Sequence, residues 1–301
     1  RAHGFSMEVF TAMLKKIKKN WNGFQCSMFG VWGSRTQDGK LYTGRNLDWV
    51  KDSGISTSKV ITIHRPEKGY AHATIGWAGI WGAITGISSQ GITVHEANLE
   101  SNDISFRGFP WVLRLRHVMA NAKNLDEALS IWKSTQSTVG FNHGIGSAAD
   151  REAICMETMF GNDAIFHAND PREQNLIING ENIGMARPEA IFRTNHGYDS
   201  YTIDHYMWNG THAYEDSIAR YKVFPEQFDQ YQSQQVKMSY KEAVSVTALV
   251  GEKGLDHIYD CDGPFDPASN ILSVTYDPAE LIAYTAWENG HESTWRPAAC
   301  N

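Results

Sequence analysis

The sequence has few cysteines and no long apolar run. Four cysteines occur among 301 residues and no pair has Cys-x-x-Cys spacing, so a zinc site or a thioredoxin-type redox motif is not expected. The longest apolar stretches, 77–87 and 243–251, are too short or too polar for the roughly 20 residues that cross a bilayer. These absences predict a soluble protein.

Positive charge is also scarce, because 27 Lys and Arg face 34 Asp and Glu and the net charge is −7. Without a broad positive field, nucleic acid is not an expected partner. The 12 histidines are scattered, with no His-x-x-x-His or His-Glu pair suited to zinc. Residues 260–263 contain two Asp and a Gly, as part of a calcium loop does, but the terminal Glu is missing. The sequence predicts no metal and no other cofactor.

The overall composition is typical of a folded globular protein. Hydrophobic residues make up 42%, charged residues 20% and aromatic residues 12%, which excludes disorder, a coiled coil and a collagen-like repeat. The length permits two domains, but no linker, repeat or low-complexity tract divides the chain. A single domain is therefore favoured.

The ends of the chain and its sequon bear on processing and compartment. The chain begins at Arg1 rather than Met and shows no signal peptide, which predicts a fragment or a processed product. Asn209 opens one Asn-Gly-Thr sequon, so a secreted form would be a glycoprotein. Cys261 and Cys300 either pair or stay as two thiols. A secreted or lysosomal location is favoured, with the cytoplasm as the alternative.

Apolar periodicity predicts the secondary structure. Residues 6–20 place apolar side chains at three- and four-residue spacing opposite four lysines, the pattern of a basic amphipathic helix. Residues 26–32 and 40–49 are predicted as the strands of a hairpin, with Asp38-Gly39 as its turn. Further strands are expected at 59–64, 70–77, 81–87, 91–97, 144–149, 153–158, 163–168, 271–276 and 281–287, and helices at 111–122, 125–135, 214–228 and 240–250.

The order of these elements indicates the architecture. Strands, helices, strands, helices and strands follow one another, which favours one α+β layered domain with helices outside two sheets. The basic helix at 6–20 needs an apolar surface to cover, or else it contacts an anionic membrane transiently. These patterns do not predict an oligomeric state.

One cysteine lies at a position where it could act as a nucleophile. Cys26 begins the first strand of the hairpin, and Arg45 and Asp48 lie on the returning strand. A nucleophilic cysteine needs a lowered thiol pKa or a nearby base, and a guanidinium favours the thiolate. The spacing alone is better explained by a buried strand cysteine with a surface Arg and Asp. In an ideal strand Arg45 and Asp48 point to opposite faces, so a bulge or a strand end is required if both reach the sulfur.

Three sequence blocks favour the catalytic interpretation. Cys26-Ser27-Met28, Asp38-Gly39-Lys40 and the Gly-Arg-Asn-Leu-Asp-Trp block at 44–49 together resemble the opening of N-terminal-nucleophile amide hydrolases. The resemblance is to the choloylglycine hydrolase and acid ceramidase group, particularly the branch of acyl-coenzyme A:6-aminopenicillanic acid acyltransferase. Members begin their mature chain with Cys, usually Cys-Thr, whereas Ser27 follows the cysteine here.

Later segments extend the resemblance. Residues 86–92 and the strand ending at Asn98 resemble the family's oxyanion segment, Thr194-Asn195-His196 resembles its second asparagine segment, and 217–220 resembles its Ser and Arg pattern. The resemblance implies a four-layer αββα sandwich of the N-terminal-nucleophile hydrolase type, which agrees with the element order. It also implies a catalytic set of Cys26, Arg45, Asp48, Asn98, Asn195 and Arg220.

In enzymes of this type the peptide bond before the nucleophile is cut autocatalytically. The resemblance implies cleavage between Gln25 and Cys26, with 1–25 as a propeptide or small subunit and 26–301 as the catalytic domain. The released α-amino group, with a reference pKa of about 7.7–8.0, then acts as the base. Arg45 would keep the sulfur anionic, and Asp48 would orient the amine. The expected reaction is hydrolysis of a linear N-acyl amide through a Cys26 thioester.

Three alternatives are open on the sequence alone. They are an acyltransferase that passes the acyl group to an amine, a ceramidase- or phospholipase-like lipid hydrolase, and a noncatalytic relative. The expected partner is a small N-acyl amide or an acylated lipid. Ten tryptophans, among them Trp77, Trp81 and Trp111, either line an acyl pocket or belong to the core. Cys155 is expected to serve packing.

Overall fold

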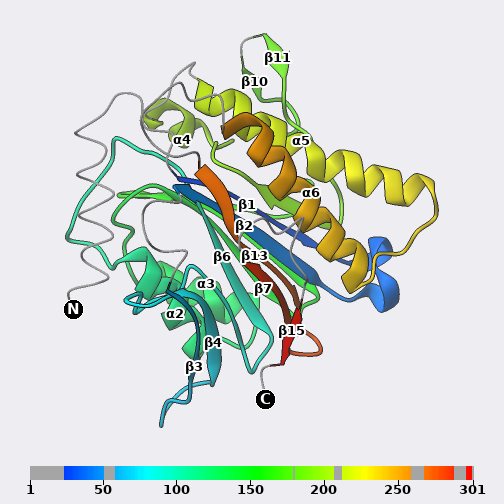
Figure 1. Cartoon of the computed structure of the whole chain (residues 1–301). Coiled ribbons are helices and arrows are strands. Elements are labelled where there is room, and N and C mark those ends of the chain that lie inside the picture. The colour runs from blue at the N-terminus through cyan, green and yellow to red at the C-terminus, as the bar shows by residue number, and fades with distance from the viewer. Residues whose placement is uncertain are drawn as a thin grey trace.

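Two antiparallel sheets form the centre of the molecule (Figure 1). The computed structural model describes residues 24–50, 58–178, 180–206, 212–258, 268–287 and 296–299. The first sheet has the order β12-β1-β2-β13-β14-β15, with strands β1 (Phe24–Val31), β2 (Tyr42–Val50), β12 (Ala190–Arg193), β13 (Ala268–Asp277), β14 (Ile282–Trp287) and β15 (Arg296–Ala299).

The second sheet keeps its strands in chain order from β3 to β9. They are β3 (Lys59–His64), β4 (His72–Trp77), β5 (Thr85–Ser88), β6 (Ile92–Asn98), β7 (Phe141–Ser147), β8 (Glu152–Met159) and β9 (Asn162–Phe166). A separate two-stranded ribbon consists of β10 (Ile177–Ile178) and β11 (Glu181–Asn182). Neighbouring strands of the second sheet are antiparallel and consecutive in sequence, as hairpin connections require. The first sheet instead pairs β1 with β12 and β2 with β13, which lie far apart in the chain.

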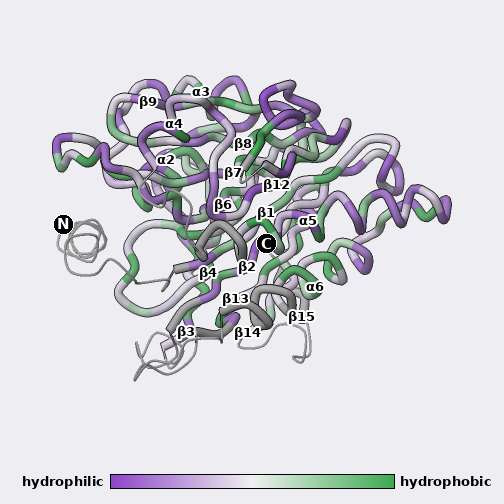
Figure 2. The backbone as a smooth tube through the Cα atoms, turned by 90° about the horizontal axis from the view of Figure 1, so that it is seen from above, coloured by the Kyte–Doolittle hydropathy of each residue, from purple (hydrophilic) through white to green (hydrophobic). Residues whose placement is uncertain are grey.

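Helices cover the outer face of each sheet. The helices α5 (His212–Ser233) and α6 (Tyr240–Ile258) contact β1, β2, β12 and β13, whereas α2 (Trp111–Asn121) and α3 (Leu125–Lys133) contact β5, β6 and β7. Figure 2 shows the same layers from above, with the strands between the two helix pairs. The short helix α4 (Ser200–His205) lies beside β8. The predicted four-layer αββα sandwich is confirmed.

The β1–β2 hairpin is regular along its whole length. Its register pairs Cys26 with Leu47 and Met28 with Arg45. The turn region contains two short 3₁₀ segments, η1 (Gly33–Arg35) and η2 (Gln37–Gly39). Asp38 and Gly39 adopt φ angles of 57° and 66°, a left-handed conformation that Asp tolerates and Gly prefers. The predicted Asp-Gly turn is therefore confirmed.

Some predicted boundaries were wrong for local reasons. The strand expected at 81–87 begins only at Thr85, because the preceding loop bonds to α2 instead, through Ala83 N–H and the Val112 carbonyl (2.8 Å). The four-residue strand β12 was not predicted, and α5 and α6 extend beyond their predicted ends. The helix predicted at 6–20, the sequon at Asn209 and the pair Cys261 and Cys300 lie outside the described residues. Among the helices of the described ranges, none has the length and apolarity to cross a membrane.

Candidate active site

The sulfur of Cys26 lies between the two sheets. Cys26 is the third residue of β1 and is 2% exposed. Arg45 on β2 donates from Nη2 to the sulfur at 3.0 Å. From the opposite sheet, Glu96 on β6 places its two carboxylate oxygens 3.9 and 4.0 Å from the same sulfur, within reach of the thiol hydrogen. The thiol thus has a cation on one side and a carboxylate on the other.

Arg45 and Glu96 also bind each other. Arg45 Nη2 lies 2.7 Å from Glu96 Oε1 and 3.2 Å from the Glu96 carbonyl oxygen, and both side chains are buried. Sequence reasoning missed Glu96. The available signal was a carboxylate inside the fully buried strand Ile92–Asn98, two residues before Asn98. A charged side chain in such a strand is expected to have an ion-pair or hydrogen-bond partner, because burying an unpaired charge is strongly unfavourable in free energy.

The electrostatics of this group favour the protonated thiol. Burial raises the pKa of the Cys26 thiol, the Glu96 carboxylate raises it further, and the Arg45 and Arg220 cations lower it only in part. Burial likewise raises the pKa of the Glu96 carboxyl, against the opposing effect of Arg45. A carboxylate with a raised pKa is a stronger base than an exposed one, so Glu96 is suited to accept the thiol proton.

The backbone of Cys26 is held from the other side. Pairing between β1 and β12 runs only from Val31 to Met28, so Cys26 lies beyond the end of β12. There its N–H donates to Asn195 Oδ1 at 3.0 Å. Arg220 on α5 donates from Nη1 to the Cys26 carbonyl at 2.6 Å and from Nη2 to Asn195 Oδ1 at 2.8 Å. The Asn195 side chain therefore binds the Cys26 nitrogen, which self-cleavage would convert into an amine.

The two predicted asparagines lie next to each other. Asn195 Nδ2 donates to the Asn98 carbonyl at 2.7 Å, and Asn98 Nδ2 donates to Glu100 Oε1 at 3.2 Å. Ser217 Oγ accepts the Asn195 N–H at 2.8 Å. A side-chain amide nitrogen carries two hydrogens, so each asparagine retains a second hydrogen with which to donate to an oxyanion.

Asp48 takes a different position from Arg45. It lies directly across from Gln25, and its Oδ1 accepts a hydrogen bond from Asn270 Nδ2 at 3.0 Å. The β1–β2 pairing is regular here, and the irregularity expected near Asp48 lies instead in β13, between Asn270 and Leu272. Asp48 raises the pKa of the Cys26 thiol from a distance. The structure thus brings Arg45 to the sulfur and Asp48 to the neighbouring residue.

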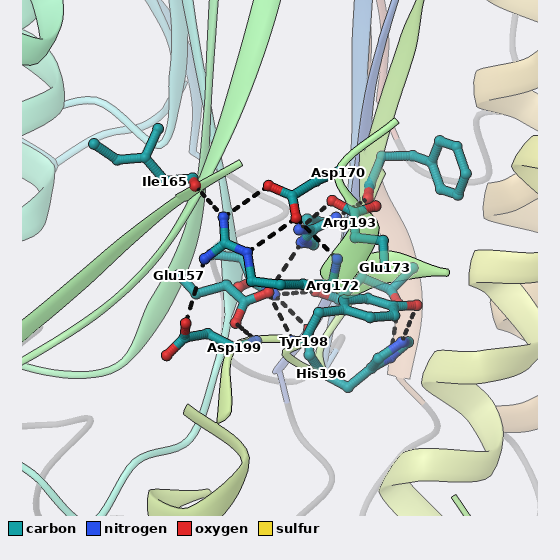
Figure 3. A network of polar contacts seen from close by, with 12 residues as sticks. Glu157, Ile165, Asp170, Arg172, Glu173, Arg193, His196, Tyr198 and Asp199 are labelled. Atoms are coloured by element: carbon teal, nitrogen blue, oxygen red, sulfur yellow. Dashed lines mark hydrogen bonds and ion pairs between the residues drawn. The ribbon is translucent and has the colours of Figure 1, made fainter. Parts of the chain in front are cut away.

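A buried polar network supports the segment that carries Asn195 (Figure 3). Arg193, at the end of β12, lies 2.6 Å from a Glu173 oxygen and 3.3 Å from a Glu157 oxygen. Glu157 accepts the backbone N–H groups of Tyr198 and Asp199 at 2.8 and 2.9 Å. These bonds tie the segment after Asn195 to β8.

His196 adds a second tie in the same segment. Its Nδ1 lies 2.7 Å from Ser217 Oγ and its Nε2 lies 3.0 Å from the Tyr198 hydroxyl. Burial lowers the pKa of His196 to about 3, and the Arg193 and Arg220 cations lower it too. His196 is therefore neutral at ordinary pH and positions its neighbours. In the described part of the chain, no three His, Cys, Asp or Glu side chains gather as a metal site.

Comparisons with known proteins identify a family and a fold. The family model described as acyl-coenzyme A:6-aminopenicillanic acid acyl-transferase matches residues 34–292. The fold is similar to a mutant of the conjugated bile acid hydrolase from Clostridium perfringens, with a TM-score of 0.56, 13% identity and coverage of 91% of this chain and 97% of that one. It is also similar to the N-acylethanolamine-hydrolyzing acid amidase ortholog of Caenorhabditis elegans, with a TM-score of 0.51, 12% identity and coverage of 84% and 93%.

A sequence relative matches a shorter part of the chain. Protein dcd1A of Dictyostelium discoideum is 30% identical over 132 residues, which are 40% of this chain and 30% of that protein. The matched region thus spans under a third of that relative's length. The family model covers most of the chain. The two solved structures have the same fold as this chain.

Proposed function

The chain belongs to the acyl-coenzyme A:6-aminopenicillanic acid acyl-transferase family, and on that premise we propose that it is a cysteine amidase whose nucleophile is Cys26. The observation that carries the proposal is the contact of Arg45 Nη2 with the Cys26 sulfur at 3.0 Å. The Cys26 N–H on Asn195 Oδ1 supports it from the other side. A buried structural cysteine would need neither arrangement.

We propose that the chain first cleaves itself between Gln25 and Cys26. Glu96 takes the thiol proton, and the sulfur attacks the Gln25 carbonyl carbon. The C–N bond then breaks, its nitrogen takes up a proton to become the Cys26 α-amine, and Gln25 is left as a thioester on the sulfur. Water hydrolyses the thioester, which leaves a carboxylate on Gln25 and restores the thiol. Residues 1–25 are then the propeptide or small subunit, and 26–301 form the catalytic chain.

In turnover the new α-amine replaces Glu96 as the base. Its reference pKa of about 7.7–8.0 suits proton transfer near neutral pH, and Asn195 Oδ1 already binds its nitrogen. Arg45 stabilises the thiolate, which attacks the substrate's amide carbonyl and forms a C–S bond. The second amide hydrogens of Asn98 and Asn195 donate to the oxyanion. The amine leaves with the proton, and water hydrolyses the thioester to the acid.

Acyl transfer is the second candidate, and the family match favours it. In that variant an amine, rather than water, attacks the thioester, and the product is a new amide. The residues on either side of the sulfur serve both reactions equally. Product analysis with and without an added amine acceptor separates the two.

Intact mass measurement with N-terminal sequencing tests the proposal most directly. Wild-type protein is expected to yield a chain that begins at Cys26, whereas Cys26→Ala is expected to remain one precursor. The mature protein is then assayed on fluorogenic N-acyl amides. Wild-type protein that stays uncut and still hydrolyses amides would show that the terminal-amine mechanism is wrong.

A further inference from the structure

The residue before Cys26 has its side chain bound inside the site. Gln25 is only 6% exposed. Its side-chain oxygen Oε1 accepts a hydrogen bond from Arg220 Nη2 at 2.5 Å. The same Nη2 donates to Asn195 Oδ1, and Nη1 donates to the Cys26 carbonyl. Arg220 is itself fully buried, so one guanidinium binds both the nucleophile's backbone and the propeptide's last side chain.

Gln25 is the acyl group of the self-cleavage reaction. In the proposed thioester its carbonyl carbon is bonded to the Cys26 sulfur, and its side-chain carbonyl lies on the fifth carbon counted from there. A substrate amide passes through a thioester on the same sulfur. The substrate's acyl chain therefore enters the position that Gln25 leaves, and its fifth carbon comes to the acceptor position on Arg220 Nη2.

We propose, as an extension of the proposed function, that Arg220 selects acyl groups with a carbonyl oxygen on the fifth carbon. The substrate class is an amide of a five-carbon acyl group that ends in a carboxamide or a carboxylate. A hydrogen bond to a charged group is strong, and a site built to form one discriminates against an analogue without the polar atom. Residue 25 is thus a template for the acyl group that follows it.

Two coumarin amides of matched shape test the inference on the mature protein. One carries a 4-carbamoylbutanoyl group, and the other carries a 5-methylhexanoyl group, in which two methyl groups replace the terminal oxygen and nitrogen. The first is expected to have a kcat/KM roughly ten- to a hundredfold higher. A third amide, with a 4-carboxybutanoyl group, shows whether the site prefers the neutral or the charged acceptor.

The outcomes separate this inference from the proposed function. Equal hydrolysis of the first two amides, abolished by Cys26→Ser, overturns the selectivity and leaves the amidase standing. No hydrolysis of either amide overturns both. A preference for the 4-carbamoylbutanoyl or 4-carboxybutanoyl amide over the apolar one supports the assignment.

Self-cleavage of the precursor gives an independent readout. Gln25→Met keeps the length of the side chain but removes its carbonyl, and it is expected to slow self-cleavage about tenfold. Gln25→Glu keeps an acceptor oxygen and is expected to cleave at close to the wild-type rate. Unfolding temperatures of the three uncut precursors, each in a Cys26→Ala background, control for folding. Equal cleavage rates for the methionine and wild-type forms overturn the template role.

Discussion

Two arginines, Arg45 and Arg193, lie fully buried between the sheets of this molecule. Each faces carboxylate groups, and each lowers the pKa of a buried cysteine thiol, that of Cys26 and that of Cys155 respectively. The two clusters share the same ingredients. They differ in the number of carboxylates that face the arginine and in whether the arginine contacts the thiol directly.

We call the Arg193 cluster closed, because two carboxylates, Glu157 and Glu173, lie within ion-pair distance of its arginine. Glu157 also accepts two backbone N–H groups. A buried ion pair with such additional hydrogen bonds serves a structural role, and removing one partner strongly lowers the free energy of unfolding.

We call the Arg45 cluster open. One carboxylate, Glu96, pairs with Nη2. Among the described residues, Nε and Nη1 of Arg45 have no hydrogen-bond partner, whereas in Arg193 this holds for Nε alone. Nη2 also donates to the Glu96 carbonyl oxygen and to the Cys26 sulfur. Of these two acceptors, the sulfur becomes an anion when the thiol loses its proton. When Glu96 takes up the thiol proton, the negative charge moves to the sulfur, which Arg45 already contacts. The comparison teaches that the cluster prepared for chemistry is the one whose arginine contacts both a carboxylate and a thiol that can exchange a proton.

Replacing each of the two cysteines by alanine is expected to give the largest difference in activity between the two clusters. Cys26→Ala is expected to lower kcat/KM by about 10³ or more, because it removes the nucleophile. Cys155→Ala should leave kcat/KM nearly unchanged, since burial raises the pKa of Cys155 to about 12 and keeps it an unreactive thiol. Amide hydrolysis by purified, fully folded variants measures both. A comparable loss in Cys155→Ala would contradict the division of roles.

Removal of the closed cluster's cation should act on stability. Arg193→Met leaves two buried carboxylates without a counter-ion, and the free energy of unfolding is expected to fall by about 3–5 kcal/mol. Arg172 offers a matched control, because its pairs with Asp170 and Asp199 are partly exposed. Arg172→Met is expected to cost no more than about 1 kcal/mol. Urea unfolding measures both variants, and equal losses would argue against a special role for Arg193.

The asparagines should affect the chemical step rather than the fold. Asn98→Ala and Asn195→Ala are each expected to lower kcat by roughly 10²-fold with a modest change in KM, as for oxyanion donors. Asn182 is an exposed asparagine whose side chain bonds within its own loop, donating to the Gln174 carbonyl and accepting the Gly184 N–H, each at 3.0 Å. Its alanine variant should match the wild type. An unchanged kcat in a folded Asn98 or Asn195 variant would remove that residue from the site.

The open cluster was half predictable from the sequence. Cys26 and Arg45 lie on one hairpin, whose Asp-Gly turn and strand pattern are local signals, and the family resemblance supplied their roles. Glu96 comes from the other sheet, 70 residues from Cys26, and no local pattern reports such a pairing. The position of Asp48 beside Asn270 depends likewise on β13, more than 200 residues away.

The closed cluster was not predictable at all. Its arginine ends β12, a strand of only four residues, which is too short to show a period. Its carboxylates come from β8 and from the 3₁₀ segment η5 (Pro171–Glu173). The layered fold itself was predicted because the pattern of each strand or helix is local, the order of these elements indicates layers, and the family resemblance implied the same sandwich. Contacts between layers are properties of pairs of distant segments.

The smallest effect expected is a shift in the pH dependence of self-cleavage. The pKa of the Glu96 carboxyl is raised above its ordinary value, so Glu96 takes up its proton at a higher pH than an exposed glutamate does. Because the carboxylate form is the base, self-cleavage should slow about tenfold for each pH unit below that pKa. Arg45 lowers the pKa of Glu96, so Arg45→Gln should move this acid limb to higher pH.

The pKa of Glu157 in the closed cluster is also raised by burial, which makes it the control for this prediction. Each raised pKa means that the folded chain holds its proton more tightly than the unfolded chain. The stabilisation from that protonation is therefore full below the unfolded pKa and is lost as pH rises through the folded pKa. Glu157→Gln should change this pH dependence of unfolding and leave the acid limb of self-cleavage in place. Glu96→Gln should abolish the limb and slow cleavage at every pH. If Glu157→Gln also removed the limb, the base would not be specific to the open cluster.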